Sequence, residues 1–126
     1  MDIMKINKIE NGRVYMLDGT TQRATLPELV NIVQQTRSVR SGLMVAISAL
    51  DELYNIKRET ADRKRDIVLS VGTIHANEIQ MQNYIECVSV LDGVSQSITD
   101  LRIVLQHVSS LELQAAKWLT ENGVII

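Results

Sequence analysis

The chain has 126 residues, of which 45% are hydrophobic and 22% charged, and its formal net charge is −2. This balance excludes an overall field strong enough to draw the protein to nucleic acid or to an anionic membrane. No apolar run approaches the roughly 20 residues that a membrane-spanning helix needs. We therefore predict a single domain over residues 1–126, with an aliphatic core because aromatic residues make up only 3% of the chain.

The first 26 residues predict a small antiparallel β-meander. Asn11-Gly12 and Asp18-Gly19 are two-residue turn signals, because these residue types tolerate the positive φ angles of tight hairpin turns. The segments 3–10, 13–17 and 20–25 flank the turns and supply the expected strands. Because an isolated hairpin is marginally stable in water, we expect this appendage to pack on another part of the chain.

A helix start follows at Thr25-Leu26-Pro27-Glu28. Thr25 is a suitable N-cap, Glu28 stands three residues later as in a capping box, and Pro27 occupies the first turn, where its missing N–H has no effect. A long helix is therefore expected from residue 27.

Apolar or small residues then recur at steps of three and four. These steps match the 3.6-residue turn of an α-helix and predict one long buried stripe. The first stripe consists of Leu29, Ile32, Thr36, Val39, Leu43, Ala46, Leu50 and Leu53. Two later stripes consist of Ile67, Val71, Ile74, Met81, Ile85 and Val88, and of Val94, Ile98, Leu101, Leu105, Val108, Leu111, Ala115, Trp118 and Leu119.

The breaks between these stripes decide the architecture. The polar stretch 57–66 favours a turn near 58–62, although counting on from Leu53 also reaches Ile67 in phase, so that one helix over 27–92 is the alternative. Asp92-Gly93 predicts a break, and 121–123 predicts a C-cap. The expected fold is mainly α: an antiparallel three-helix bundle or a long, coiled-coil-like helical hairpin over 27–121, with the β-meander at 1–26 and an apolar tail at 122–126.

Few residues suggest catalysis or metal binding. His75 and Glu78 are three residues apart and could bind a metal, but the more frequent situation is two polar residues on the outer face of a helix. Cys87 has no histidine near it in the sequence and is expected to be a buried or half-buried thiol. His107 is expected at the boundary of a buried stripe. We therefore predict no enzyme activity, no cofactor and no metal; a small ligand-binding or metal-binding bundle that uses His75, Cys87 or Tyr84 is an alternative.

The first alternative to the favoured function is a regulator associated with nucleic acid, ahead of the ligand-binding or metal-binding bundle. Its candidate residues are the basic side chains Arg58, Arg63, Lys64 and Arg65. Residues 57–66 carry a net charge of only +2, because three acidic residues accompany the five basic ones. No aromatic side chains accompany them for base stacking. A solvated helix surface is therefore the favoured interpretation of this stretch.

The C-terminal end contains the strongest interaction candidate. Five large apolar residues lie close together, and they either cover the end of the chain's own core or contact a partner. They are Trp118, Leu119, Val124, Ile125 and Ile126.

The favoured function is a non-enzymatic, self-associating helical protein that acts as an adaptor, chaperone or structural component. Small proteins of this composition are frequent among bacterial and phage accessory components. The expected partners are a second copy of the chain or another protein, without a membrane. A single cysteine and an N-terminus without a continuous apolar segment favour the cytoplasm.

Overall fold

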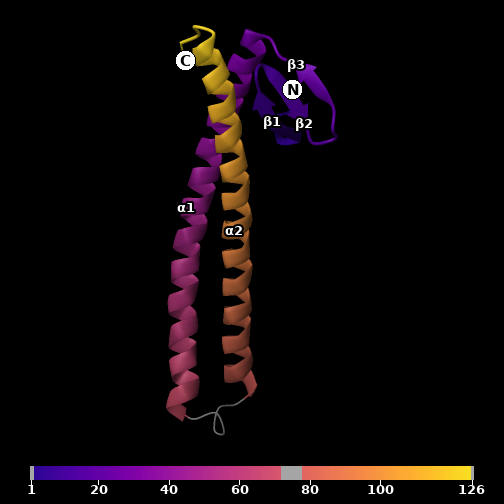
Figure 1. The fold of residues 1–126 in the computed structure, drawn as a ribbon. Helices are drawn as coiled ribbons and strands as arrows, with labels where there is room; N and C mark the ends of the chain where they lie inside the picture. Colours follow the sequence, from indigo (N-terminus) through magenta and orange to yellow (C-terminus); the bar gives the residue numbers. More distant parts are fainter. Residues whose placement is uncertain (1, 72–77, 126) are drawn as a thin grey trace. The chain divides into compact units, whose positions relative to one another are not determined.

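The structure, a computed structural model, describes residues 2–71 and 78–125 (Figure 1). The chain contains a short 3₁₀ turn, three strands and two helices: η1 (Ile3–Lys5), β1 (Ile6–Glu10), β2 (Arg13–Met16), β3 (Thr21–Arg23), α1 (Leu26–Val71) and α2 (Glu78–Glu121). The prediction of a mainly helical fold with an N-terminal antiparallel meander is confirmed. Of the two helical architectures expected, the long hairpin is the one observed. Neither helix, within the described residues, has a stretch long and apolar enough to cross a membrane.

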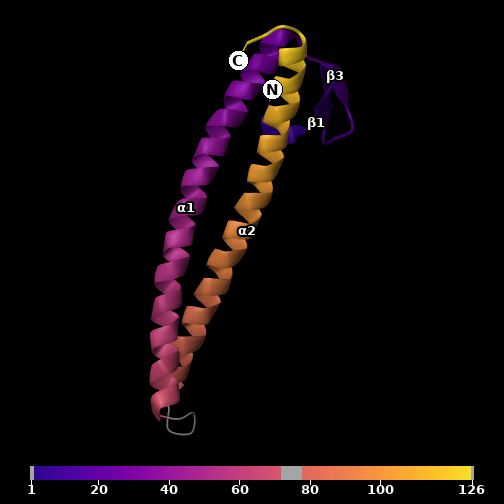
Figure 2. The same cartoon turned by 60° about the vertical axis from the view of Figure 1, so that its left-hand side comes forward.

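The chain divides into two compact units. The head unit comprises residues 1–44 and 102–126, and the hairpin unit comprises residues 45–101. In each unit, the α1 and α2 segments run side by side and antiparallel (Figures 1 and 2).

The predicted turn chemistry forms the sheet, whose strand order is β1-β2-β3 with antiparallel pairs. Asn11 and Gly12 both have positive φ, 53° and 75°, and bring Glu10 opposite Arg13. Gly19, with φ 89°, serves the second turn.

The start of α1 follows the predicted capping box. The backbone N–H of Glu28 donates to Thr25 Oγ1 at 3.3 Å, and the Thr25 hydroxyl donates to the Glu28 carboxylate at 3.0 Å. The cap therefore satisfies the Glu28 N–H, one of the backbone groups that the first helical turn leaves free.

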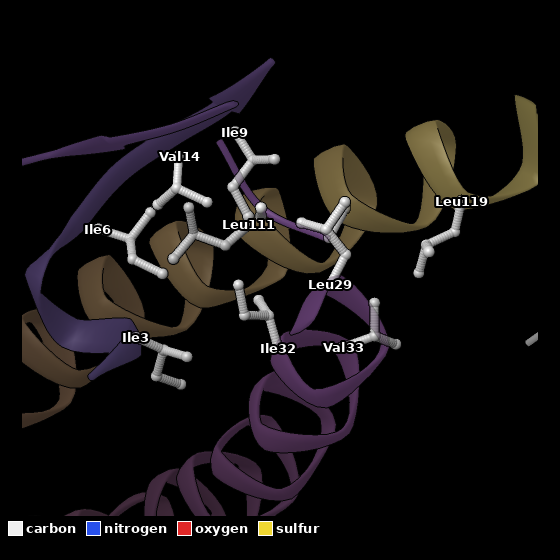
Figure 3. Close-up of a cluster of buried hydrophobic side chains, with 11 residues drawn as sticks. Ile3, Ile6, Ile9, Val14, Leu29, Ile32, Val33, Leu111 and Leu119 are labelled. Atoms are coloured by element: carbon white, nitrogen blue, oxygen red, sulfur yellow. The ribbon is translucent and has the colours of Figure 1, made fainter. Parts of the chain in front are cut away.

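The core of the head unit lies where the sheet covers the beginning of α1 and the end of α2 (Figure 3). Three layers thus contribute side chains to one cluster of fully or almost fully buried residues. Its largest members are Ile6, Val14, Leu29, Ile32, Val33, Leu111 and Leu119.

Both helix breaks predicted within residues 57–93 are wrong. α1 continues through 58–62 to Val71, and α2 continues through Asp92 and Gly93. The polar stretch 57–66 contains neither Gly nor Pro, so no residue in it opposes helical geometry. In α2, half-buried Leu91 and Val94 keep the stripe in phase on both sides of Gly93, and this packing outweighs the roughly 1 kcal/mol helix penalty of glycine. The alternative of one helix over 27–92 is not observed either, since α1 ends at Val71 and α2 begins at Glu78.

The first predicted stripe is correct at its beginning and drifts along α1. Leu29, Ile32 and Thr36 are buried, whereas Leu53 is 38% exposed. Farther along, Ile67 is 50% exposed and its neighbour Val68 only 5%. A straight α-helix completes about ten turns in 36 residues, so the residue aligned with Ile32 is Val68, not Ile67.

The stripe predicted on α2 is correct at Met81 and Val88, which are half-buried, and wrong at Ile85, which is exposed. Tyr84, Cys87 and Leu91 are also half-buried and belong to the same face. Tyr84 and Cys87 are not strongly apolar, which is why hydropathy placed Ile85 in the stripe instead of Tyr84.

Gly12 has a second role that its turn does not explain. A Cβ atom at this position would lie 2.9 Å from Cε2 and Nε1 of Trp118, whereas a Cβ at Gly19 would meet nothing within 4 Å. The indole of α2 therefore packs directly on the β1–β2 turn.

We expect Gly12→Ala to lower the free energy of unfolding by about 2–4 kcal/mol, because the methyl group adds a steric clash to an unfavourable φ. The matched control Gly19→Ala has only the unfavourable φ and should lose about 1 kcal/mol. Trp118 is the only tryptophan, so urea unfolding followed by its fluorescence measures both variants. Equal losses would show that the ring does not restrict position 12.

Candidate interaction surfaces

The predicted C-terminal interaction residues belong largely to the core of the head unit. Leu119 is fully buried, and Trp118 and Val124 are half-buried against the same cluster. Ile125 is 98% exposed, and Ile126 lies outside the described residues. Of these five residues, Leu119, Trp118 and Val124 therefore contribute to the core of the head unit, and Ile125 is left exposed.

A regular C-cap causes this arrangement. Gly123 adopts φ 77°, and the N–H of Val124 donates to the Leu119 carbonyl at 2.9 Å, as in a Schellman motif. The chain reverses after α2 and directs Val124 onto the core. No strand is formed by the described part of the tail.

Two polar side chains of α2 cover the free edge of β1. His107 Nε2 donates to the Ile6 carbonyl oxygen at 2.8 Å, and the Ile9 N–H donates to Gln114 Oε1 at 2.7 Å. Seven helical residues span about 10.5 Å and three strand residues about 10 Å, so the two hydrogen bonds match in spacing. His107 thus has a structural role. The sequence predicted only that this residue lies at the boundary of a buried stripe.

A buried carboxylate interrupts the apolar stripe of α2. Glu112 is 8% exposed, and its Oε2 lies 3.3 Å from Arg40 and 3.9 Å from Arg37 of α1. Its Oε1 is buried and has no hydrogen-bond partner among the described residues. Both arginines are partly exposed, so the cluster links the two helices at the surface of the head unit.

The predicted nucleic-acid residues do not form one patch. Successive residues of a helix point about 100° apart, so Arg63, Lys64 and Arg65 face three directions. Arg65 also lies 3.6 Å from the carboxylates of Asp62 and Asp66. These positions argue against a single basic surface on α1.

The candidate catalytic and metal-binding residues are dispersed as well. Cys87 is half-buried, as expected, and Tyr84 is half-buried one turn away. His75 lies outside the described residues. Within residues 2–71 and 78–125, no three His, Cys, Asp or Glu side chains are close enough to hold a metal ion.

The hairpin unit leaves most of its large aliphatic side chains incompletely buried. Only four of its described hydrophobic residues are buried: Ile47, Ala61, Val68 and Ile98. Eight large aliphatic residues are exposed, namely Val45, Leu53, Ile56, Ile67, Leu69, Ile79, Ile85 and Val90. In a two-helix layer, each helix can hide only the stripe that faces its neighbour.

A shallow groove runs between the two helices of the hairpin unit. Two adjoining depressions share Lys64 and Asn83 and form this groove. Its lining from α1 is Lys57, Thr60, Lys64 and Ile67, and its lining from α2 is Gln80, Asn83, Glu86, Cys87 and Val90. We call this side of the hairpin unit the groove face.

Two aliphatic rows border the groove face. Ile56 and Ile67 are eleven residues apart on α1, and Ile79 and Val90 are eleven residues apart on α2. Eleven residues make about three turns, so each pair lies nearly on one line of its helix. Sequence reasoning missed this surface, and the eleven-residue spacing was the available signal.

The chain matches no protein-family model, no curated protein and no solved structure.

We expect Arg37→Ala/Arg40→Ala to lower the free energy of unfolding of the head unit by about 2 kcal/mol, because it leaves the Glu112 carboxylate buried without a cation. Glu112→Leu should be neutral or stabilising by up to about 2 kcal/mol, because it fills an apolar stripe. Combined with Glu112→Leu, the arginine substitutions should lose their effect. Urea unfolding measures all three variants. If the arginine substitutions lowered the free energy of unfolding by the same amount with Leu at position 112, the arginines would not act through Glu112.

Proposed function

We propose that this chain is a non-enzymatic helical assembly protein that associates with itself through the groove face of its hairpin unit. The observation that carries the proposal is the excess of exposed over buried large aliphatic side chains in this unit. Exposed apolar rows of this kind are typical of protein interfaces.

The contrast with the head unit supports this interpretation. There the sheet acts as a third layer and closes the core over the start of α1 and the end of α2, although Ile103 and Leu113 of α2 stay exposed. The hairpin unit consists of two helical segments, without a described strand or further helix to cover its second face. Burying one aliphatic side chain contributes about 1.5–3 kcal/mol, so a second pair of helices on this face would be stabilising.

The polar residues considered for catalysis fit a structural role better. His107 is hydrogen-bonded to the backbone of β1, and Cys87 lies in the wall of the groove, whose described lining residues include no histidine. This arrangement supports assembly rather than chemistry as the role of the hairpin.

The test compares two single variants of similar exposure. Ile67→Glu alters a groove-lining residue that is 50% exposed, and Leu69→Glu alters a residue that is 61% exposed. The control residue lies on the other flank of α1, since Leu69 follows Ile67 by about 200°. We expect light scattering to report an oligomer for the unsubstituted chain and the control, and a monomer for the groove-face variant.

Circular dichroism should show equal helix content in the three proteins. A monomeric unsubstituted chain at all concentrations would contradict self-association. An equal loss of association in both variants would show that the groove face is not the interface.

A further inference from the structure

The distribution of charge on the groove face points to a specific arrangement of two copies. We infer that the hairpin units of two copies meet groove face to groove face, about a two-fold axis that runs along the groove. α1 of each copy then lies on α2 of the other, and Lys57 and Lys64 of one copy face Glu86 of the second. This inference rests on the proposed self-association and specifies its geometry.

The two helices of the hairpin unit differ in charge. Residues 78–101 of α2 contain four acidic residues and no lysine or arginine. Residues 45–71 of α1 contain five basic and five acidic residues, and the basic ones are gathered in residues 57–65. The groove itself repeats this asymmetry, because its lining has Lys57 and Lys64 on α1 and Glu86 on α2.

The two groove lysines, Lys57 and Lys64, form no ion pair within the described part of the chain. Glu86 accepts a hydrogen bond of 3.3 Å from Gln82 of its own helix. The lysines therefore remain available to a carboxylate of another molecule.

A surface that has a basic edge and, parallel to it, an acidic edge is complementary to a second copy of itself. A two-fold axis along the groove exchanges the edges, so each basic edge meets an acidic one, as an isologous interface requires. A two-fold axis across the groove would instead place α1 on α1 and bring the lysines of both copies together. Electrostatic complementarity therefore selects the first arrangement.

The aliphatic rows fit the same arrangement. Ile67 shares its depression with Asn83, and Ile79 precedes Asn83 by one helical turn, so Ile67 and Ile79 lie near one level of the hairpin. Rotation about the groove axis preserves that level and brings Ile67 of one copy towards Ile79 of the other. By the same rotation, Ile56 meets Val90.

The experiment reverses the charges on one helix at a time. Lys57→Glu/Lys64→Glu makes both edges of the groove acidic, and Glu86→Lys makes both basic. We expect each variant alone to associate with itself roughly 30-fold or more weakly than the unsubstituted chain, because like charges would face each other. An equimolar mixture should form a heterodimer with nearly the original affinity, since both of its edges are again complementary.

Native mass spectrometry distinguishes the heterodimer from the two homodimers, and analytical ultracentrifugation gives the affinities. The control is Arg58→Glu/Arg65→Glu, which has the same charge change as the double lysine variant on the other flank of α1. This control should still form its homodimer.

Homodimers of both charge variants, or a mixture that remains monomeric although the unsubstituted chain associates, would overturn the arrangement and leave the proposed function standing. A monomeric unsubstituted chain would overturn both. A misfolded variant is recognised by its helix content, and the single chain carrying all three reversals then provides the test, because its homodimer should be restored.

Discussion

Two helices packed side by side can shield only one stripe of each other from water, and this limit governs both units of the chain. The head unit meets it by adding a third layer. The sheet covers the beginning of α1 and the end of α2, and residues such as Leu29, Val14 and Leu111 become fully buried. The hairpin unit lacks such a layer among its described residues, and its second apolar face stays exposed. The proposed assembly follows from this difference.

Because each helix buries one stripe against its neighbour, the buried stripe of α2 continues through residues that are polar or have a low helix propensity. From Tyr84 to Leu119, buried or half-buried positions recur at steps of three and four, and they include Cys87 and Glu112. Gly93 falls between two such positions and remains helical. A regular buried stripe thus determines the helix, and single unfavourable residues are tolerated when packing on either side of them is continuous.

Local features of the fold could be predicted from the sequence because their causes are local. The Asn11-Gly12 turn, the Thr25–Glu28 capping box and the Gly123 C-cap each depend on a few adjacent residues, and all three were correct. The helix breaks were wrong because polarity at 57–66 and glycine at 93 were given more weight than the phase of the stripe. Phase itself failed over a long range: a drift of about 20° per seven residues is small locally but moved the buried position from Ile67 to Val68.

The surfaces were harder to predict, because they depend on which residues the second helix covers. His107 and Gln114 gained their partners only once the edge of β1 lay beside α2, at a separation of about a hundred residues along the chain. The groove face has the same origin, since Ile56 and Ile67 belong to an apolar flank whose exposure depends on the path of α2. The sequence contained the basic cluster, but only the helix geometry separates Lys64, in the groove, from Arg65, which pairs with Asp62 and Asp66.

Charged side chains in the groove would make an exposed apolar face selective for its partner. A purely aliphatic face would bind many apolar surfaces with similar affinity, whereas a charge that faces the wrong partner must lose its water without compensation. Lys57 and Lys64 occupy the positions on α1 where an aliphatic residue would extend the buried stripe, so they weaken the packing of the two helices within the hairpin unit. In the proposed pair, the same lysines face Glu86, and any partner without a carboxylate at that position is disfavoured. In the proposed assembly, the packing lost at these two positions would therefore favour a second copy of this chain, in one orientation, over other apolar surfaces.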